Sequence, residues 1–546
     1  MEMFDYIVVG GGSAGTVLAT RLSENPERTI LLLEAGADFP TRESLPAPLR
    51  RINAMSQMAP GSPYSWGFFG RTDAATVPII RGRVIGGGST VNGAGHWWPA
   101  RDDLDAWAAC GNPEWSWDKL LPFLIAMEDD RDFQGSLHGR DGPLPITRPA
   151  KAEMMPISRA FCDACAELGF PWDDDKNAPT SINGVGPNPC NAIGGDRIST
   201  PIAYLNPARG RANLTIRGDS FVRRVLFDGR RAIGVEVEQD GQIRTIHGRE
   251  VILSAGAIKT PHILMLSGIG PADQLQRHDI TVLCDLAGVG QNFQDHPGVD
   301  ITFLPRRPFE VGPDTGFAEA TLHYTAAGSD IPGDMEILCL TMPMSQMLSD
   351  GKGLGPRSLG DRWRGLVALV RAGLRLGLRG ALRMRRAMAA QMLSCRLMAE
   401  YSRGTSTLTS PDPHILPEYN FHSFSDPRDV SRLIECVRIG IRMLEGPAIS
   451  PLVKRRLTPT DAQLSSDEAL ATWIKSAVPP YAHTTGSCRM GPATDPEAVV
   501  DQHCRVHGVD GLRVVDLSIC PTNPRRGPAA TAILIAERAA SLIKAA

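Results

Sequence analysis

The chain has 546 residues, 42% of them hydrophobic and 21% charged, and its formal net charge of -3 gives no overall attraction to nucleic acid. Residues 1–5 lead directly into an apolar run without a basic flank, and no stretch of about 18 apolar residues follows, so neither a signal peptide nor a membrane span is expected. The 11 cysteines show no disulfide-type spacing, which favours reduced thiols and a cytoplasmic location.

The first elements form a strand, a glycine-rich turn, a helix and a second strand. Residues 5–9 predict a buried strand, and Gly10-Gly11-Gly12-Ser13-Ala14-Gly15 follows it. A helical pattern comes next, and a strand over 29–33 then ends at Glu34. This order of elements, with G-x-G-x-x-G after the strand and an acid after the second strand, is typical of dinucleotide binding.

Each part of this motif has a physical task. Gly10 allows the tight turn, Gly12 lets the backbone approach a pyrophosphate, and Gly15 lets the helix pack on the strand. The helix N-terminus provides unpaired N–H groups for the phosphates. Glu34 can accept hydrogen bonds from an adenosine ribose, which favours FAD or NAD over NADP.

The same residues also match G-x-S-x-G, the nucleophile elbow of serine hydrolases, with Ser13 as the nucleophile. An elbow normally follows several strands, whereas Ser13 follows the first. A small residue beside phosphates explains Ser13 equally, so a hydrolase is the remote alternative.

A second glycine-rich loop, Gly86-Gly87-Gly88-Ser89, lies between Arg81 and Asn92. Its backbone N–H groups can face a phosphate or a flavin edge, and a plain loop is an equal alternative. Further on, residues 248–256 predict a strand, and a helical run from Pro261 to Leu266 follows, with proline in its first turn.

The C-terminal region begins with His483-Thr484-Thr485-Gly486. A strand over 512–516, a loop through Pro521 and a final helix over about 530–545 complete the chain. A lone histidine is more often structural than catalytic, so the case for His483 depends on its neighbours.

Together, the blocks at 5–34, 81–92, 254–270 and 483–545 resemble the glucose–methanol–choline (GMC) oxidoreductase family, and the likeness covers essentially the whole chain. Bacterial aryl and primary alcohol oxidases and dehydrogenases look most similar. The resemblance implies an α/β fold, α+β overall. It would combine a Rossmann-like FAD-binding domain with a substrate domain built on an antiparallel sheet, and it would oxidise an alcohol to an aldehyde or ketone.

The resemblance also assigns roles to single residues. His483 falls on the catalytic histidine that faces flavin N5, Val222 on a valine whose backbone meets adenine, and Asp516 near the pyrimidine end of the flavin. Residues expected to bind the cofactor are Gly10, Gly12, Ser13, Ala14, Gly15, Glu34, Gly86, Gly88, Ser89, Asn92, Val222, Asp516 and Ala529. A neutral imidazole can take the alcohol proton while the carbinol hydrogen leaves as hydride to the flavin.

Three positions depart from the family pattern. Gly527 stands where the family usually has a His or Asn that binds the substrate oxygen, so either His483 works alone, a neighbour such as Asn523 or Arg526 substitutes, or the chemistry differs. Val91 stands where some members attach FAD covalently through a histidine, so non-covalent FAD is expected. Trp98-Pro99 replaces the usual Arg-Gly; an aromatic entrance made by residues 96–98 and a packed loop are equal alternatives.

The length exceeds one ordinary core, and no repeat of about 20 to 50 residues is present, so two domains are expected. The FAD-binding domain is predicted to consist of 1–155, 205–300 and 478–546, and the substrate domain of 156–204 and 301–477.

Residues 352–390 form an unusual insert with ten Lys or Arg against one acid, Asp361. Their spacing predicts a basic amphipathic helix. A surface helix packed on the substrate domain is the favoured interpretation. Peripheral docking on the inner face of a membrane, suited to electron delivery to a quinone, and a protein interface are the alternatives.

Other cysteines and histidines give weaker signals. Cys162 and Cys165 form a C-x-x-C in a helical pattern without a second pair, so neither zinc nor a redox pair is favoured. His503, Cys504 and His507 are expected in a hairpin, and no metal site is predicted.

The substrate and the electron acceptor are less defined. Trp97, Trp98 and the apolar stretch 338–344 suggest a small apolar or aromatic alcohol. The acceptor is O2, a quinone or another carrier. Because of Gly527, a GMC-like flavoprotein with lyase or photodecarboxylase chemistry is the alternative function.

Overall fold

The computed structural model describes residues 2–54, 57, 61–343, 345, 380 and 386–545, so most of the predicted basic insert at 352–390 lies outside the described residues. Within these ranges, none of the helices combines the length and the apolar character needed to cross a bilayer.

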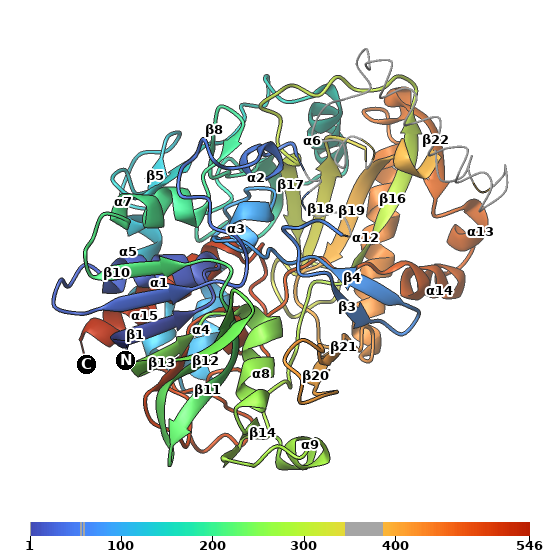
Figure 1. The fold of residues 1–546 in the computed structure, drawn as a ribbon. Coiled ribbons are helices and arrows are strands. Elements are labelled where there is room, and N and C mark those ends of the chain that lie inside the picture. The colour runs from blue at the N-terminus through green and yellow to red at the C-terminus, as the bar shows by residue number, and fades with distance from the viewer. Residues whose placement is uncertain are drawn as a thin grey trace.

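The first large sheet contains seven strands, and its centre is parallel (Figure 1). The parallel strands are β10 (Leu214–Arg217), β2 (Ile30–Leu33), β1 (Met3–Val9), β13 (Gln242–Leu253) and β23 (Leu512–Val514). An antiparallel meander of β11 (Phe221–Asp228) and β12 (Arg231–Gln239) extends the sheet beyond β13. The strands that carry the predicted dinucleotide motif therefore lie side by side at its centre.

Helices cover this sheet and explain the pattern of its strands. Helix α1 (Ser13–Leu22) follows β1 and packs against the final helix α15 (Ala529–Lys544). All four residues of β2 are buried, as expected for a parallel strand covered on both faces. The predicted Rossmann-like architecture is confirmed.

The second large sheet is antiparallel throughout and has six strands. In spatial order they are β22 (Val453–Thr458), β16 (Gly298–Pro305), β19 (Gln391–Leu397), β18 (Met335–Leu340), β17 (Ala318–Tyr324) and β7 (Gly184–Pro187). Helices α12 (Pro427–Glu445), α6 (Pro156–Glu167) and α14 (Asp467–Ala477) pack their apolar faces on it. The predicted antiparallel substrate sheet is confirmed.

A smaller, four-stranded sheet joins distant parts of the chain (Figure 1). In it, β3 (Phe68–Arg71) and β4 (Thr76–Ile79) pair with β20 (Thr405–Thr407) and β21 (Glu418–Asn420). Sequence patterns assigned these hairpins to different domains, and only the structure shows that they form one sheet.

Shorter elements complete the fold. The helices are α2 (Ala47–Arg50), α3 (Gly88–Val91), α4 (Arg101–Ala109), α5 (Trp117–Ala126), α7 (Asn206–Ala208), α9 (Ala272–Arg277) and α13 (Asp461–Leu464). The strand pairs are β5 (Glu128–Asp130) with β6 (Leu144–Ile146), β8 (Ala192–Ile193) with β9 (Asp196–Arg197), and β14 (Ile269–Gly270) with β15 (Cys284–Asp285).

One predicted helix start is wrong. Helix α8 spans Gly256–Leu266, so it begins five residues before Pro261, which lies inside it. Pro261 cannot donate to the carbonyl of Ala257 four residues earlier. The hydroxyl of Ser487 donates to that carbonyl instead, at 2.6 Å. A residue distant in sequence thus repairs the helix, which a local proline rule cannot foresee.

Candidate active site

The two glycine-rich loops meet at the N-terminus of α1. The backbone N–H of Gly86 donates to the carbonyl of Gly11 at 2.6 Å. The hydroxyl of Ser13 accepts from the backbone N–H of Ser89 at 3.0 Å and donates to the carbonyl of Gly86 at 3.4 Å. The fold therefore brings the predicted residues of both loops together. Because Ser13 serves as a bridge between loops, its geometry does not support the hydrolase alternative.

The three motif glycines differ in what surrounds them. Gly10 has a φ of 101°, and a Cβ there would lie 2.5 Å from the carbonyl oxygen of Ser254; a Cβ at Gly15 would lie 1.9 Å from the carbonyl oxygen of Gly10. At Gly12 the nearest described atom would be 3.9 Å away. Packing therefore requires glycine at positions 10 and 15 but not at 12. The open space at Gly12 matches the close backbone approach that a pyrophosphate needs.

Glu34 is buried at the carboxyl end of β2. Its carboxylate accepts hydrogen bonds from the backbone N–H groups of Gly11 at 2.9 Å and Gly36 at 2.8 Å. Burial raises the pKa of Glu34 to about 7, although these two N–H groups oppose the shift. Each carboxylate oxygen retains acceptor capacity for a ribose hydroxyl. Val222 lies on β11, two residues beyond Ser220, whose N–H donates to the Glu34 carbonyl.

The opposite end of the candidate cofactor site has several unused polar groups. Helix α15 begins at Ala529, and no side chain among the described residues caps its N-terminus. The side chains of Asn523, Thr485 and Thr531 each carry a buried polar atom without a hydrogen-bond partner in the described part of the chain. Buried polar groups are ordinarily bonded, so these atoms fit a polar ligand such as the flavin.

The carboxylate of Asp516 has partners within the protein. It accepts from the N–H of Gly256 at 2.8 Å, the hydroxyl of Thr260 at 2.6 Å and the N–H of Ser518 at 2.8 Å. Its side chain thus joins β23 to the start of α8, and the predicted contact with the cofactor stays a prediction.

His483 is held in place by neighbours from two distant segments. The carboxylate of Asp295 accepts from the backbone N–H of His483 at 2.7 Å and from that of Ala482 at 3.1 Å. The guanidinium of Arg81 donates to the carbonyl of Ala482 and to the hydroxyl of Thr484. Nδ1 of His483 lies 2.9 Å from Nδ1 of His296. These contacts leave Nε2 as the ring nitrogen for chemistry.

His483 is neutral at physiological pH. Burial lowers its pKa well below the ordinary 6.5, and repulsion from His296, Arg81 and Arg396 lowers it further. Burial also lowers the pKa of His296 to about 3. A neutral imidazole with a free ring nitrogen has the form that a general base requires.

Gly527 faces His483, and the ring of Trp97 borders the space left by the missing side chain. A Cβ at Gly527 would lie 3.1 Å from Cε3 of Trp97 and 3.7 Å from Cε1 of His483. A Cβ at Gly95 would lie only 2.0 Å from Cζ3 of the same ring. The two glycines therefore make room for the indole, and the edge beside His483 is apolar because the indole N–H is on the other ring.

Arg526 and Asn523, the two residues expected to substitute for the missing polar group at position 527, differ in whether their polar atoms are already bonded. Arg526 is buried and donates to the carbonyls of Ser181, Gly333 and Arg525, so its guanidinium is engaged. Asn523, by contrast, has both side-chain polar atoms buried and unpartnered within the described ranges. Of the two, Asn523 retains hydrogen-bonding capacity for a ligand.

Tyr481, two residues before His483, and an apolar cluster that includes residues of the substrate sheet contribute to the surroundings of His483. The rings of Tyr481 and His483 have centroids 4.3 Å apart, and the Tyr481 hydroxyl donates to Glu336 at 2.9 Å. Tyr481 and Phe317 also pack against the buried side chains of Ala318, Leu338, Leu340, Met342 and Met392. Part of the predicted apolar stretch 338–344 therefore packs next to the residue that precedes the histidine by two positions.

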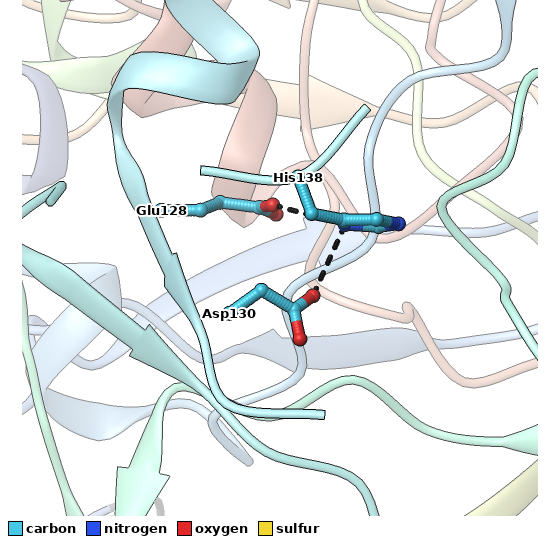
Figure 2. Close-up of side chains that lie close together, drawn as sticks. All are labelled: Glu128, Asp130 and His138. Atoms are coloured by element: carbon cyan, nitrogen blue, oxygen red, sulfur yellow. Dashed lines mark ion pairs between the residues drawn. The ribbon is translucent and has the colours of Figure 1, made fainter. Parts of the chain in front are cut away.

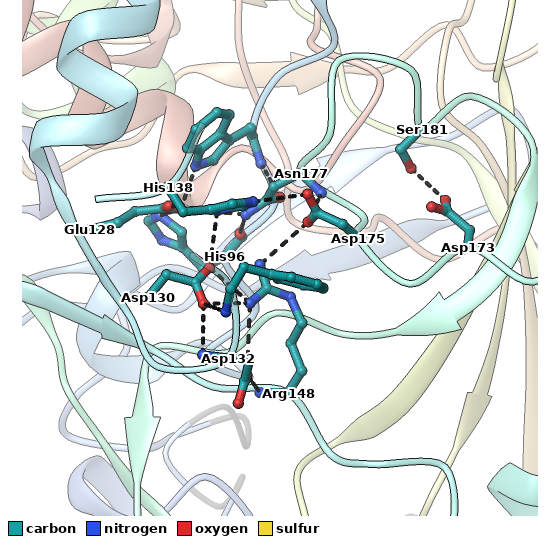
Figure 3. A network of polar contacts seen from close by, with 12 residues as sticks. His96, Glu128, Asp130, Asp132, His138, Arg148, Asp173, Asp175, Asn177 and Ser181 are labelled. Atoms are coloured by element: carbon teal, nitrogen blue, oxygen red, sulfur yellow. Dashed lines mark hydrogen bonds and ion pairs between the residues drawn. The ribbon is translucent and has the colours of Figure 1, made fainter. Parts of the chain in front are cut away.

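The residues before α4 do not form a simple aromatic entrance. Trp98 is buried and its indole donates to Glu128, while Asn177 bonds to the N–H of Trp98 and the carbonyl of His96 (Figure 3). Only Trp97 of the three reaches the site. His96 and Trp98 therefore belong to a packed loop and not to an aromatic entrance, and they anchor the segment that carries Trp97.

The anchor belongs to a buried network of charges around His138 (Figure 3). Nδ1 of His138 lies 3.1 Å from Asp130, and its Nε2 lies 3.0 Å from Asp175. Arg148 contacts both carboxylates, at 2.8 Å and 3.4 Å. Burial opposes protonation, but hydrogen bonds to Asp130, Asp175 and Glu128 outweigh it and raise the pKa of His138 to about 11.

Glu128, Asp130 and His138 also lie close enough to hold a metal ion, with candidate ligand atoms within 4.8 Å of one another (Figure 2). A metal needs the neutral imidazole, so it would have to displace a proton from His138, whose pKa the neighbouring carboxylates raise to about 11, and Arg148 already contacts Asp130. Ion pairing accounts for this arrangement without a metal.

The other cysteines and histidines singled out in the sequence have structural surroundings. Cys162 and Cys165 lie buried on α6, and burial raises the pKa of Cys162 to about 12 and that of Cys165 well above its ordinary value. Thiols held in this form are poor nucleophiles. His507 bonds to the carbonyl of Gly491 at 3.1 Å, near the turn that precedes β23.

Sequence patterns missed Asp295, His296 and Arg81 as neighbours of His483. The sequence signal for these neighbours was the polar pair Asp295-His296, which lies just before the buried strand β16. A polar pair at such a place indicates a site only once its partner, almost 190 residues away, is known.

Comparison with known proteins gives long matches. Residues 4–298 and 400–536 match two sequence families, both described as GMC oxidoreductase. An uncharacterised GMC-type oxidoreductase of Rhodococcus erythropolis is 37% identical over 540 residues, covering 99% of this chain and 98% of that protein. The oxygen-dependent choline dehydrogenase of Photobacterium profundum is 33% identical over 546 residues, covering 99% and 93%.

Solved structures agree. Pyridoxine 4-oxidase from Mesorbium loti superimposes with a TM-score of 0.85 at 30% identity, covering 100% of this chain and 99% of that one. Formate oxidase from Aspergillus oryzae gives a TM-score of 0.83 at 25% identity, with 100% and 98% coverage.

Proposed function

This chain belongs to the GMC oxidoreductase family of FAD-dependent enzymes, and from that premise we propose that it oxidises a small-molecule alcohol to an aldehyde or ketone with His483 as the base. FAD supplies the acceptor for the hydride. The protein holds the alcohol, removes its hydroxyl proton and keeps water away. We propose Gly10, Gly12, Gly15, Glu34, Ala529 and the loop from Gly86 to Asn92 as residues that hold the cofactor.

The arrangement of His483 carries this proposal. Asp295 and Arg81 fix its backbone, and His296 occupies its Nδ1. Its pKa lies well below 6.5, so Nε2 can accept a proton throughout the neutral range. General-base catalysis of this kind contributes about 10²- to 10⁴-fold to a rate.

An apolar or aromatic alcohol suits the surroundings of this histidine best. The indole edge of Trp97 and the ring of Tyr481 flank it, and the apolar cluster around Leu338 and Met342 packs behind Tyr481. Such surfaces favour flat or hydrocarbon groups beside the carbinol carbon.

The mode of FAD binding, the compartment and the electron acceptor complete the proposal. Val91 is buried and offers no group for a bond to FAD, so we propose non-covalent FAD, which acid precipitation would release into the supernatant. All 11 cysteines are free, which supports a reducing compartment such as the cytoplasm. O2, a quinone or another carrier would take the electrons.

The test is anaerobic reduction of the purified, yellow protein by aryl, alkyl and polyol alcohols. We expect the flavin absorbance between about 350 and 500 nm to bleach with one class of alcohol. In the His483→Ala protein the bleaching should slow by at least about 10²-fold. A wild-type protein that no alcohol bleaches would contradict alcohol oxidation.

One observation favours a second candidate. Gly527 and the apolar edge of Trp97 leave His483 without a second polar side chain at the usual position. A flavoprotein with lyase or photodecarboxylase chemistry does not need net oxidation of an alcohol. Flavin that stays oxidised with every alcohol, while a cyanohydrin or an illuminated fatty acid is cleaved, would establish this alternative.

A further inference from the structure

A small cavity lies next to the segment that contains His296. It is lined by residues of the segment 293–297, by Glu400 and Ser402, and by Phe421, Ser423, Thr72 and the prolines 479 and 480. The volume of this cavity that is open to the centre of a water molecule is about 20 Å³. A cavity needs roughly 10 to 15 Å³ of such space to hold one water, so this one has room for a water beside the Glu400 carboxyl.

Glu400 is the unexplained group in this cavity. Its side chain is buried, and neither carboxylate oxygen has a hydrogen-bond partner among the described residues. A buried carboxyl without a partner costs free energy, so its retention calls for a function or a bound water. Arg403, Asp429 and Asp295 are the charged groups that face it.

The tautomers of the two histidines are linked. A base at Nε2 of His483 must carry its own proton on Nδ1, and this N–H then donates to Nδ1 of His296 at 2.9 Å. His296 must therefore carry its proton on Nε2, a buried atom without a hydrogen bond of good geometry in the described part of the chain, and the backbone of Pro524 lies near the ring as a weak partner. His296 is also one of the residues that line the cavity together with Glu400.

We propose that His296, the cavity water and Glu400 form a proton relay that removes the alcohol proton from His483. The proposal rests on alcohol oxidation as proposed above. The alcohol O–H bond breaks as an N–H bond forms at Nε2 of His483. The N–H at Nδ1 of His483 breaks as one forms at Nδ1 of His296. The N–H at Nε2 of His296 breaks as an O–H bond forms on Glu400 through the water.

Both rings begin and end this relay uncharged, which suits their burial beside Arg81 and Arg396. The hydride leaves the carbinol carbon for the flavin in the alcohol oxidation proposed above. When an acceptor such as O2 or a quinone takes up a proton on reduction, the reverse order of transfers restores both tautomers. Thr72, Pro479 and Pro480 at the cavity wall are partly exposed, so protons can also exchange with solvent there.

His296 and Glu400 are positioning residues in this scheme, because neither touches the substrate. Three variants of the holoenzyme separate their roles. Glu400→Gln keeps the shape of the side chain but cannot accept a proton. His296→Asn can still accept from Nδ1 of His483 but cannot pass a proton on. The matched control is Glu319→Gln, a buried glutamate on β17 that accepts from the N–H of Met155 at 2.8 Å.

The experiment is an anaerobic stopped-flow reduction with an alcohol that bleaches the wild-type flavin, recorded together with a pH-indicator dye. In the wild type the proton should appear in solvent in step with bleaching, and faster as pH rises through about 8. Burial raises the pKa of Glu400 to about 8, Arg403 opposes the shift, and only the ionised carboxylate accepts a proton. Glu400→Gln and His296→Asn should slow proton release at least tenfold, and Glu400→Gln should lose the pH dependence.

Thermal unfolding gives an independent readout. The stability linked to neutral Glu400 is present below its ordinary pKa of 4.5 and is lost as pH rises through about 8. The difference in Tm between Glu400→Gln and the wild type should therefore be more positive at pH 8 than at pH 5.

Proton release at the wild-type rate in both relay variants would overturn the relay, as would an equal slowing in Glu319→Gln. No bleaching of the wild type by any alcohol would overturn the proposed function together with the relay, whereas normal bleaching with unchanged proton release overturns the relay alone.

Discussion

Two buried histidines of this chain, His138 and His483, have opposite electrostatic surroundings. His138 contacts three carboxylates, and its pKa rises to about 11. His483 contacts a neutral imidazole and faces two guanidinium groups, and its pKa falls well below 6.5. Burial lowers both, so the neighbouring charges decide the outcome. Of these two histidines, the one that contacts three carboxylates is a structural cation, and the one whose ring contacts no carboxylate is the candidate base.

The two clusters are physically connected. The network around His138 includes Glu128, which bonds to Trp98 and so anchors the segment that places Trp97 beside His483. The charged cluster thus supports the geometry of the neutral one. Substitutions in the two clusters should therefore have different effects on rate and on stability.

The largest effect is expected at the neutral cluster. His483→Gln should lower the rate of flavin reduction by about 10²- to 10⁴-fold, because the proton acceptor is lost. The melting temperature should change little, since Asp295 bonds to the backbone of His483 rather than to its ring. Rapid-reaction spectroscopy and thermal unfolding check both. A drop of less than threefold in rate would show that another group is the base.

The charged cluster should respond in the opposite way. His138→Gln leaves the buried carboxylates of Glu128 and Asp130 and the half-buried Asp175 without their shared cation, while Arg148 still contacts Asp130 and Asp175; loss of a buried partner costs about 3 to 5 kcal/mol. Tm should fall clearly, while folded enzyme retains most of its rate of flavin reduction. The result that contradicts this comparison is a stable variant that no longer reduces its flavin.

Trp97 provides a more moderate effect at the junction of the clusters. Trp97→Ala opens the space beside Gly527 and should shift kcat/KM toward bulkier alcohols by about 10- to 100-fold, the range of one hydrophobic contact or more. Gly527→Asn alone should bind substrate poorly, because its Cβ would lie 3.1 Å from the indole. The double variant should recover part of the loss. Strict additivity of the two changes would argue against direct contact.

The smallest effect is a pH dependence of stability. Because folding raises the pKa of His138 from 6.5 to about 11, its stabilisation is complete below pH 6.5 and is lost as pH rises through about 11. The Tm of the wild type should fall from pH 7 to pH 10 by more than that of His138→Gln. Parallel curves for the two proteins would show that His138 is not the protonated group. His483 contributes no such loss in this range, since its folded pKa lies below 6.5.

Local sequence was enough to identify the dinucleotide fold. The spacing of Gly10, Gly12 and Gly15, the two apolar strands around them and Glu34 all act within 30 residues, where backbone geometry and burial follow from neighbours in the chain. The antiparallel substrate sheet came from the family resemblance and not from strand patterns. Helix α8 was misplaced because the group that satisfies the carbonyl opposite Pro261 comes from Ser487.

The sequence by itself determined the fold class, the cofactor motif and the identity of His483 as the candidate base. Tertiary structure alone decided the surroundings of that base: His296 at its Nδ1, Trp97 beside the space left by Gly527, and a small cavity lined by both His296 and Glu400. The physical reason is that a pKa and a tautomer depend on charges and donors within a few ångströms. The chain supplies those groups from segments separated by tens to hundreds of residues.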